Sequence, residues 1–408
     1  MTQIPKSAPD TRRRRSGSAR RAVALGVVAA ATATAALAAP ALATGTEPES
    51  RKAGFGRAEL QRGLDDIVRA DGVVGVQATL VQGAGRTYAR SGTAERGTDR
   101  PMPHQGSFRM GSNTKTFVAT VVLQLVAEGR MGLDDSVEHH LPGVVGGNGH
   151  DGRKITVRQL LQHTSGLPDY DGHLPGVVDE EKFQQHRYDT YRPAQLVALG
   201  LSEKPLFAPG EGFSYSNTGY ILTGMIIKKV TGQHWSQEVR ERIIEPLGLK
   251  HTFSPGARTG LPGPHSKAYQ QFKPGGALID STEVNMSWGD SAGDLVTTSN
   301  DLARFWQGLL GGKLLGKRQL AQMRTTVPAP DESLPMTERS GLGIFWRELS
   351  CGGGYWGHGG STLGHLNANG FTGKGGRGAI VMRNSNLAFA DRDIRADKLV
   401  DAALCDGR

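Results

Sequence analysis

The sequence predicts an α+β fold, in which an antiparallel sheet is flanked by helices and a mostly helical lobe lies beside it. Two observations support this class. Segments with the two-residue period of strands occur near both ends of the chain, and apolar segments with helical period occur between them. Strands from the two ends of a chain can pair in one sheet, while the helices in between pack on it or beside it.

The first 43 residues have the pattern of a secretory signal peptide. Six arginines between positions 12 and 21 precede an apolar, uncharged stretch over residues 22–39, and Ala41-Leu42-Ala43 fits a cleavage site. We therefore expect a secreted protein, cleaved near Ala43, with a flexible linker over residues 44–56. The apolar stretch is rich in alanine and threonine and poor in leucine, which disfavours the alternative of a stable membrane anchor.

Most of the net positive charge of the chain lies in this N-terminal segment. The formal net charge is +9, and residues 1–43 contribute seven cations and one anion, or +6, which leaves +3 for the remainder. No run of basic residues interleaved with aromatic residues follows. We therefore expect no nucleic-acid partner.

From residue 57 to residue 128 the pattern predicts a helix, two strands and a second helix. In residues 57–71 the apolar positions are three or four residues apart, as in an amphipathic helix. Residues 73–81 are rich in valine and residues 87–91 follow two turn glycines, so both segments favour strands. Residues 117–128 are apolar on nearly every side, which predicts a buried helix that ends at Gly129.

The rest of the chain predicts further helices and then further strands. Helical period recurs over residues 155–161, 220–230, 235–244, 301–310 and 393–404. The period changes to two over residues 342–349, 366–372 and 378–383. Residues 168–210 have no clear period, and residues 254–280 are rich in glycine and proline, so we expect a long loop there.

The sequence contains two cysteines, Cys351 and Cys405, both near its C-terminal end. An exported chain reaches an oxidising compartment, so we expect a disulfide between them, with two free thiols as the alternative. The sequence has no cluster of cysteine and histidine at metal-ligand spacing and no phosphate-binding loop. We therefore expect neither a metal nor a cofactor.

A serine and a lysine three residues apart precede the apolar helix. At this spacing Ser112 and Lys115 share one helix face, and a serine needs a neighbouring base to act as a nucleophile. The positive end of the helix dipole opposes the charged form of Lys115 and favours an oxyanion near Ser112. No other serine has a lysine at the third position after it. The alternative is an ordinary helix cap followed by a first-turn lysine.

Tyr215-Ser216-Asn217 is a second motif, and its Tyr-x-Asn pattern also occurs once in the chain. A tyrosine hydroxyl can carry a proton to a leaving group. An asparagine amide can donate to a substrate carbonyl and accept from Lys115. The alternative for Tyr215 is a ring packed in the core.

His358-Gly359-Gly360 is a third and less specific motif, because similar His-x-Gly and Lys-x-Gly triplets occur at five other places. Its position late in the chain, directly before Ser361-Thr362, distinguishes it. Glycines here would let a substrate backbone approach a strand. The alternative is an ordinary turn.

The three motifs together resemble those of the serine penicillin-recognising family, which includes penicillin-binding proteins and class C-type β-lactamases. Residues 160–168 and 291–295 resemble two further loops of this family, so the resemblance covers roughly residues 55–405. It implies a β-lactamase/transpeptidase-like catalytic domain over residues 57–408. A helical lobe at roughly residues 115–285 would be inserted in its α/β lobe.

The resemblance also implies catalytic roles. Ser112 would attack a carbonyl carbon and become acylated, while Lys115 and Tyr215 move the protons. The backbone N–H groups of Ser112 and Ser361 would form the oxyanion hole.

The substrate-binding residues implied by the resemblance are Asn217, Trp288, His358, Gly360 and Ser361. For Trp288 the alternative is simple core packing. The chain departs from the family at Gly359, where a hydroxyl residue is usual. That hydroxyl, with a cation, would bind a terminal carboxylate of a substrate, and Arg347 is a candidate for the cation.

The closest functional resemblance is to a secreted, soluble D-alanyl-D-alanine carboxypeptidase. Such an enzyme acts on peptidoglycan stem peptides or another D-amino-acid acyl donor and is acylated by β-lactams, and we expect a monomer. The alternatives are a class C-type β-lactamase, an esterase or a D-amino-acid amidase that uses the same site. A third alternative is a module that only binds wall peptides or β-lactams.

Overall fold

A computed structural model of the chain describes residues 55–330, 339–388 and 394–406. The predicted signal peptide and most of the predicted linker lie outside the described residues. Among the residues described, no helix combines the length and the apolar character needed to cross a membrane.

The helical segments of the described residues are α1 (Arg57–Asp71), α2 (Asn113–Ala127), α3 (Val137–His140), α4 (Val157–Gln162), η1 (Asp171–His173), α5 (Pro175–Val178), α6 (Glu180–His186), α7 (Pro193–Gly200), α8 (Asn217–Thr231), α9 (Trp235–Val239), η2 (Arg240–Ile244), α10 (Glu245–Leu247), η3 (Met286–Trp288), α11 (Asp290–Gly293), α12 (Ser299–Leu310), α13 (Lys317–Met323) and α14 (Arg395–Cys405). The strands are β1 (Gly75–Gln82), β2 (Gly85–Gly92), β3 (Phe108–Arg109), β4 (Gly146–Gly147), β5 (His150–Asp151), β6 (Tyr269–Gln270), β7 (Ile279–Asp280), β8 (Val296–Thr297), β9 (Val327–Pro328), β10 (Arg339–Ser340), β11 (Phe345–Glu348), β12 (Gly354–Gly357), β13 (Gly360–Ser361), β14 (Leu366–Phe371), β15 (Arg377–Arg383) and β16 (Ser385–Asn386).

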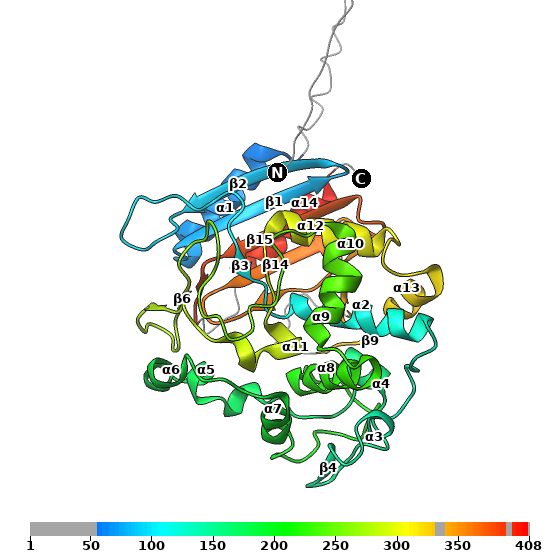
Figure 1. Cartoon of the computed structure of the whole chain (residues 1–408). Helices are drawn as coiled ribbons and strands as arrows, with labels where there is room; N and C mark the ends of the chain where they lie inside the picture. Colours follow the sequence, from blue (N-terminus) through cyan, green and yellow to red (C-terminus); the bar gives the residue numbers. More distant parts are fainter. Residues whose placement is uncertain (1–54, 331–338, 389–393, 407–408) are drawn as a thin grey trace, which may run out of the picture. The chain divides into compact units, whose positions relative to one another are not determined.

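The main sheet is antiparallel and is built from both ends of the chain. Its strands follow the order β2-β1-β15-β14-β12-β11-β10-β9, and β13 also pairs with β14. The N-terminal β1 pairs with the C-terminal β15, with Val76 opposite Arg383 and Gln82 opposite Arg377. In Figure 1 the blue and the orange-to-red elements accordingly lie side by side. The predicted α+β class is confirmed.

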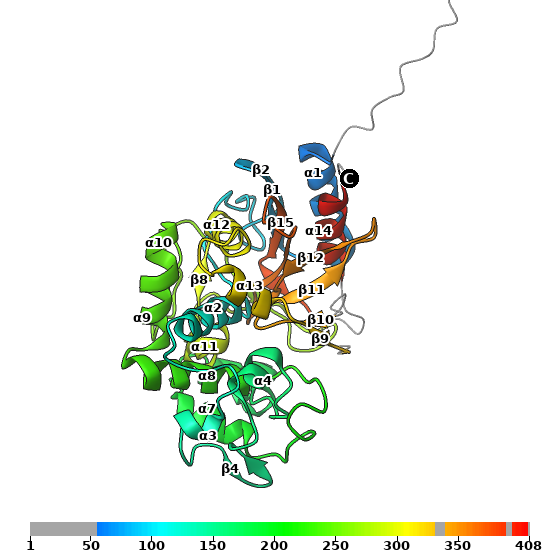
Figure 2. The same cartoon turned by 90° about the vertical axis from the view of Figure 1, so that its right-hand side faces the viewer.

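Helices cover both faces of this sheet (Figure 2). On one face α1 and α14 bury Leu64 and Val400 against alternate strand residues such as Val381. The neighbouring residues of β15, Ile380 and Met382, point to the opposite face and belong to the larger core, which also holds most of α2. Two separate cores therefore sandwich the sheet.

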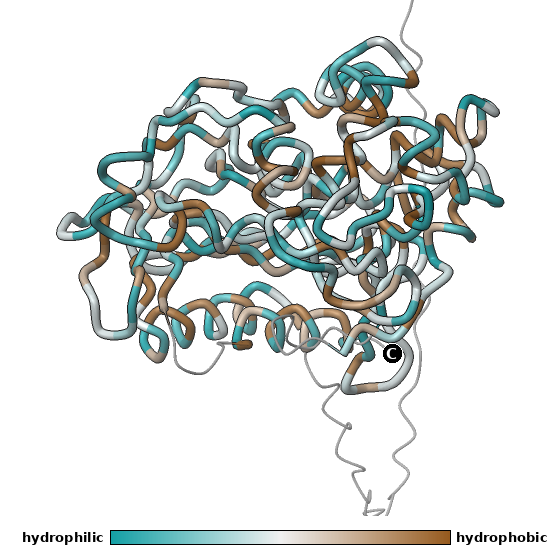
Figure 3. Tube along the Cα trace, turned by 90° about the horizontal axis from the view of Figure 1, so that it is seen from below, coloured by the Kyte–Doolittle hydropathy of each residue, from teal (hydrophilic) through white to brown (hydrophobic). Residues whose placement is uncertain are grey.

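Most helices have hydrophobic residues on the face that packs on a core and polar residues on the opposite face. In Figure 3 brown and teal residues alternate along the helical parts of the trace, as expected when each helix turns one face to a core. The helix α2 is the exception, because it is buried almost throughout. Burial of one large apolar side chain contributes about 1.5–3 kcal/mol, so these cores hold the start of α2 in place.

The structure contains every helix and strand that the period predicts, with shifted ends. The helix α2 begins at Asn113, four residues before the predicted start, because the polar first turn hides the helical period. The helices α5 to α7 lie in residues 168–210, where no clear period was visible, and each has eight residues or fewer. Segments this short do not complete enough turns to show a period.

A disulfide joins Cys351 to Cys405, as predicted, with their Cα atoms 5.7 Å apart. It ties the turn after β11 to the end of α14. Closing a 54-residue span constrains the unfolded chain by about 4 kcal/mol in the chain-entropy model. The disulfide therefore stabilises the packing of α14 on the sheet.

Candidate active site

The nucleophile predicted from the sequence stands at the start of α2. Ser112 is the N-cap residue of this helix. Gly111 before it adopts a left-handed conformation, with φ of +54°, and a side chain at that position would collide with the Ser361 backbone. This close approach places Ser112 beside β13, which pairs with β14 of the main sheet.

Lys115 lies one helical turn after Ser112 and is completely buried. Its Nζ atom lies 3.0 Å from Ser112 Oγ, 2.6 Å from Asn217 Oδ1 and 2.8 Å from the Ala292 carbonyl oxygen. Burial lowers the pKa of Lys115 to about 7, against the opposing charges of Asp169 and Asp171. A neutral amine can donate to both carbonyl oxygens and accept the Ser112 proton, so this geometry suits a general base.

We expect the rate of Ser112 acylation to rise with pH around a midpoint near pH 7, because the pKa of Lys115 is lowered to about 7. Below that pH Lys115 is protonated and cannot take the serine proton. Above it the neutral amine predominates and the rate levels off. The measurement is kcat/KM for an activated ester from about pH 5 to about pH 9, which reports the pKa of the base in the free enzyme. A rate that still rises steeply at the alkaline end would contradict this assignment.

Tyr215 lies on the other side of Ser112. Lys115 Nζ lies 4.8 Å from the centre of its ring, and the nearby Ser112 side chain acts to lower the pKa of its hydroxyl. Burial raises the pKa of Tyr215 well above its usual value of 10. Tyr215 therefore stays a phenol, which can hand a proton to a leaving group but is a poor first base.

Asn217 links Lys115 to two carboxyl groups that sequence reasoning missed. Its Oδ1 atom accepts from Lys115, and its Nδ2 atom lies 2.9 Å from Asp169 Oδ2 and 2.9 Å from Asp171 Oδ2. Burial raises the pKa of both aspartates. The turn recognised in the sequence ends at Pro168, so continuing it by three residues would have revealed both carboxyl groups.

Three buried asparagines fix the start of α2 against the third motif. Asn113 Nδ2 donates to Asn367 Oδ1 at 2.7 Å, and Asn369 Nδ2 donates to Asn113 Oδ1 at 2.9 Å. Asn369 Nδ2 also donates to the His358 carbonyl oxygen at 2.6 Å. Buried amides of this kind depend on each other for their partners, so they hold α2, β14 and His358 in one arrangement.

The third motif forms the strand β13 and the turn that enters it. His358 is buried, and its Nδ1 atom donates to the Gly359 carbonyl oxygen at 2.7 Å. Burial and the charge of Lys115 lower the pKa of His358 to about 3, so the ring stays neutral. A side chain at Gly360 would lie 1.9 Å from the Met110 carbonyl oxygen, so only glycine fits there.

These residues surround a cavity of about 650 Å³. Lys115 is buried behind Ser112, and the other predicted catalytic and substrate-binding residues line the cavity: Ser112, Tyr215, Asn217, Trp288, His358, Gly360 and Ser361. The carbonyl oxygen of Trp288 accepts from the Tyr170 hydroxyl at 2.5 Å, which fixes this part of the wall.

Arg347, the candidate for binding a terminal carboxylate, also lines the cavity. Its Nη1 atom forms an ion pair with Asp397 Oδ1 of α14 at 2.5 Å. A substrate carboxylate would have to compete with Asp397 for this guanidinium. The sequence did not indicate this pair, because the two residues are far apart along the chain.

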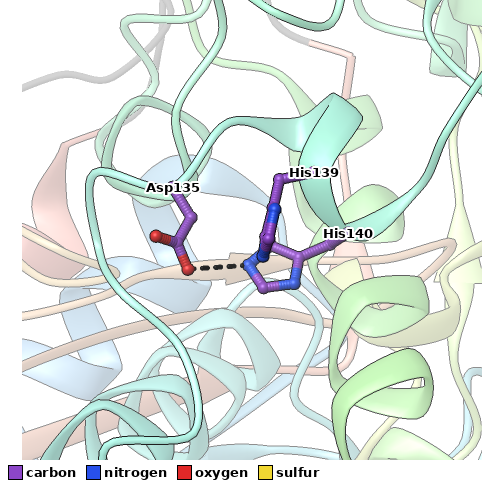
Figure 4. A group of neighbouring side chains, drawn as sticks. All are labelled: Asp135, His139 and His140. Carbon is purple, nitrogen blue, oxygen red and sulfur yellow. Dashed lines mark hydrogen bonds and ion pairs between the residues drawn. The ribbon is translucent and has the colours of Figure 1, made fainter.

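A group of possible metal ligands lies elsewhere, around α3. Ligand atoms of Asp135, His139 and His140 lie within 4.8 Å of one another (Figure 4). Asp135 Oδ2 forms a hydrogen bond with His140 Nε2 at 3.0 Å and accepts from the Gly132 N–H at 2.6 Å. These bonds tie α3 to the turn before it. None of the three residues lines the cavity, so they take no part in the chemistry proposed below.

Comparison with known proteins identifies the family of the chain. The family model described as Beta-lactamase matches residues 60–404. A crystal structure of a D-stereospecific amidohydrolase from Streptomyces sp. is 42% identical, with a TM-score of 0.78, over 86% of this chain and 98% of that one. The crystal structure of D-amino acid amidase from Ochrobactrum anthropi SV3 with L-phenylalanine amide is 30% identical, with a TM-score of 0.74, over 85% and 97% of the two chains.

Curated relatives include a penicillin-binding protein of Bacillus subtilis (strain 168), which is 36% identical over 163 residues, or 40% of this chain and 33% of that protein. The chain spans less than half the length of the curated relatives it matches first. The family match, in contrast, covers nearly all of the described residues. The chain therefore belongs to the β-lactamase family of serine hydrolases, the serine penicillin-recognising family to which its three motifs point.

Proposed function

We propose that the protein is a serine amidohydrolase that cleaves amides of D-amino acids and carries the acyl group on Ser112. The observation that supports this best is the carboxyl pair Asp169 and Asp171 at the cavity, which suits a substrate with a free ammonium group. The names of the two similar structures, a D-stereospecific amidohydrolase and a D-amino acid amidase, support the D configuration.

In the acylation step Lys115 Nζ takes the Ser112 proton while Ser112 Oγ forms a bond to the substrate carbonyl carbon. The backbone N–H groups of Ser112 and Ser361 stabilise the resulting oxyanion. The carbon–nitrogen bond then breaks, and the leaving nitrogen takes the hydroxyl proton of Tyr215. The proton held by Lys115 returns through the Ser112 position to Tyr215, which restores both groups.

In the deacylation step a water molecule replaces the amine. The water gives a proton to Lys115 Nζ and forms a bond to the acyl carbon. The bond between that carbon and Ser112 Oγ then breaks. Ser112 Oγ recovers a proton and the D-amino acid leaves as its carboxylate. Lys115 is thus the base in both steps, and it returns the proton to Ser112 Oγ at the end of the second.

Asp171 is the residue best placed to bind the ammonium group of the substrate. It lines the cavity, and its Oδ1 atom is buried and has no hydrogen-bond partner among the described residues. A buried carboxyl oxygen without a partner is unfavourable, and an incoming ammonium group would supply one. A cation beside the pair would also favour the ionised forms of both aspartates.

D-alanyl-D-alanine carboxypeptidase activity is the second candidate, favoured by Arg347 and Arg383 in the cavity lining. Both arginines already face carboxylates: Arg347 pairs with Asp397, and Arg383 lies 3.9 Å from Asp71. Gly359 also lacks the hydroxyl that the family uses for a terminal carboxylate. A substrate that ends in a neutral amide avoids both problems, so we place the amidase first.

The test is to incubate the protein separately with D-phenylalanine amide, its L enantiomer and a D-Ala-D-Ala peptide, and to measure released ammonia and D-alanine. We expect ammonia from the D-amide, much less from the L-amide, and little D-alanine. Release of D-alanine without ammonia would replace the first proposal by the second. A β-lactam adduct on Ser112, measured by intact mass, would show that the nucleophile is active even if neither substrate is cleaved.

Replacing Asp171 with asparagine is expected to lower kcat/KM for a D-amino acid amide by about 100-fold, because a hydrogen bond to a charged group is worth roughly 1.5–3 kcal/mol. The same amide with an acetylated nitrogen carries no ammonium group, so the variant should change its hydrolysis little. Asp134→Asn, at an exposed carboxylate paired with Arg158, is the matched control. An equal loss on both substrates would mean that Asp171 acts on Lys115 rather than on the substrate.

We also propose that the protein is exported. This rests on the pattern of residues 1–43, and N-terminal sequencing of protein from the culture medium would test it. A mature N-terminus near residue 44 is the expected result.

A further inference from the structure

The turn His163-Thr164-Ser165-Gly166, one of the loops that resemble the family, contains a histidine without an assigned role. His163 is 2% exposed and does not line the cavity. It nevertheless contacts Ser214 and the first two residues of the second motif, Tyr215 and Ser216. The Ser214 N–H donates to the His163 carbonyl oxygen at 3.0 Å, and the Ser216 N–H donates to His163 Nδ1 at 3.2 Å.

Between these two hydrogen bonds the imidazole ring stacks on Tyr215. The ring centres are 4.3 Å apart and the planes differ by 25°. His163 thus holds the backbone on both sides of Tyr215 and covers one face of its ring. The Tyr215 side chain has few ways left to turn away from Ser112.

The tautomer of His163 follows from these contacts. Because Nδ1 accepts from Ser216, the ring proton must be on Nε2, and that atom is buried without a partner among the described residues. Burial and the nearby Lys115 and His358 lower the pKa of His163 well below 6.5, so the ring stays neutral. Only the neutral form leaves Nδ1 free to accept.

The backbone conformation of His163 indicates that its side chain is needed. It adopts a left-handed conformation with φ of +62° at the end of α4. A residue other than glycine costs roughly 1–2 kcal/mol in this conformation. Glycine is the usual residue at such a position, so the imidazole must contribute something that glycine cannot.

We propose that His163 is a positioning residue that holds the Tyr215 hydroxyl in line with Ser112 and the leaving group. It acts through two hydrogen bonds to the flanking backbone and one stacked ring, and it does not touch the substrate. This inference rests on the proposed Ser112 acyl-enzyme and on the role of Tyr215 as proton donor.

Two variants test it without adding backbone strain. His163→Gly keeps the left-handed conformation and removes both the acceptor and the ring. His163→Asn also tolerates this conformation, and its Oδ1 atom reaches the place of Nδ1, so it keeps the bond to Ser216 but loses the stacked ring. His140→Asn, at a histidine of similar burial outside the site, is the matched control, and melting curves check that each variant is folded.

The substrates separate positioning from general damage. Hydrolysis of an amide needs a proton on the leaving nitrogen, whereas p-nitrophenolate leaves an ester without one. We expect His163→Gly to lower kcat for the amide by about 100-fold, the size of loss that a misplaced catalytic group produces. KM for the amide and kcat for the p-nitrophenyl ester should change little. His163→Asn should recover part of the lost amide activity.

A double-variant comparison decides whether His163 acts through Tyr215. In a Tyr215→Phe background, His163→Gly should cause little further loss, because the group that it positions is already absent. Equal losses on amide and ester, or losses that multiply in the double variant, would overturn the inference. A wild-type protein that acylates with neither substrate would instead overturn the proposed function, which keeps the two failures distinct.

Discussion

Replacing Lys115 with methionine is expected to slow acylation of Ser112 by about 10³-fold, within the range that a general base contributes. The loss should be similar for amides, activated esters and β-lactams, because Ser112 needs a base in every case. Methionine has the length and helix propensity of lysine, so α2 should keep its place. The measurement is the rate of adduct formation by intact mass, with a melting curve on the same sample.

The control for this variant is Ser112→Ala, which should form no adduct at all. Lys115→Met should retain a slow but measurable rate, because the oxyanion hole and the cavity remain. A variant that unfolds near room temperature would point to a structural role for the buried lysine. A folded variant that acylates at the wild-type rate would assign the base to another group.

Replacing Tyr215 with phenylalanine is expected to slow amide hydrolysis by about 10²–10³-fold, because the leaving nitrogen loses its proton donor. The effect on a p-nitrophenyl ester should be much smaller, because its leaving group needs no proton. The stacked contact with His163 does not require the hydroxyl, so the ring should stay in place. The measurement is kcat for the two substrates at the same pH.

This comparison also separates Tyr215 from Lys115. If Tyr215 were the base that activates Ser112, the ester would lose as much rate as the amide. The raised pKa of Tyr215 and the lowered pKa of Lys115 argue against that exchange of roles. Equal losses on both substrates would therefore overturn the assignment of Lys115 as the first base.

Much of the fold follows from local patterns in the sequence. The two-residue period locates the main-sheet strands β1, β2, β14 and β15, and the period of about 3.6 residues locates the longer helices. In each case side chains at that spacing share one face of the element. Short segments such as β12 and α5 were missed, since they are too short to show a period. The expected export and the presence of only two cysteines were enough to predict the disulfide that the structure contains.

The catalytic pair, Ser112 and Lys115, could also be predicted from the sequence. Ser112 and Lys115 lie on the same helix, so their spacing by itself brings them together. The contact between Tyr215 and this pair, in contrast, depends on how α8 packs against α2. The sequence supported it only through the resemblance to a family with the same three motifs.

The sequence by itself thus determined the fold class, the family and the nucleophile with its lysine, since each depends on residues close together in the chain or on a recognisable motif. The tertiary structure alone decided that Lys115 is fully buried, which lowers its pKa to about 7 and leaves much of the amine neutral, and so able to accept a proton, near neutral pH. It also brought His163 to Tyr215, placed Asp171 at the cavity and paired Arg347 with Asp397. Burial and contacts between distant residues arise only when the elements pack, and no local period records them.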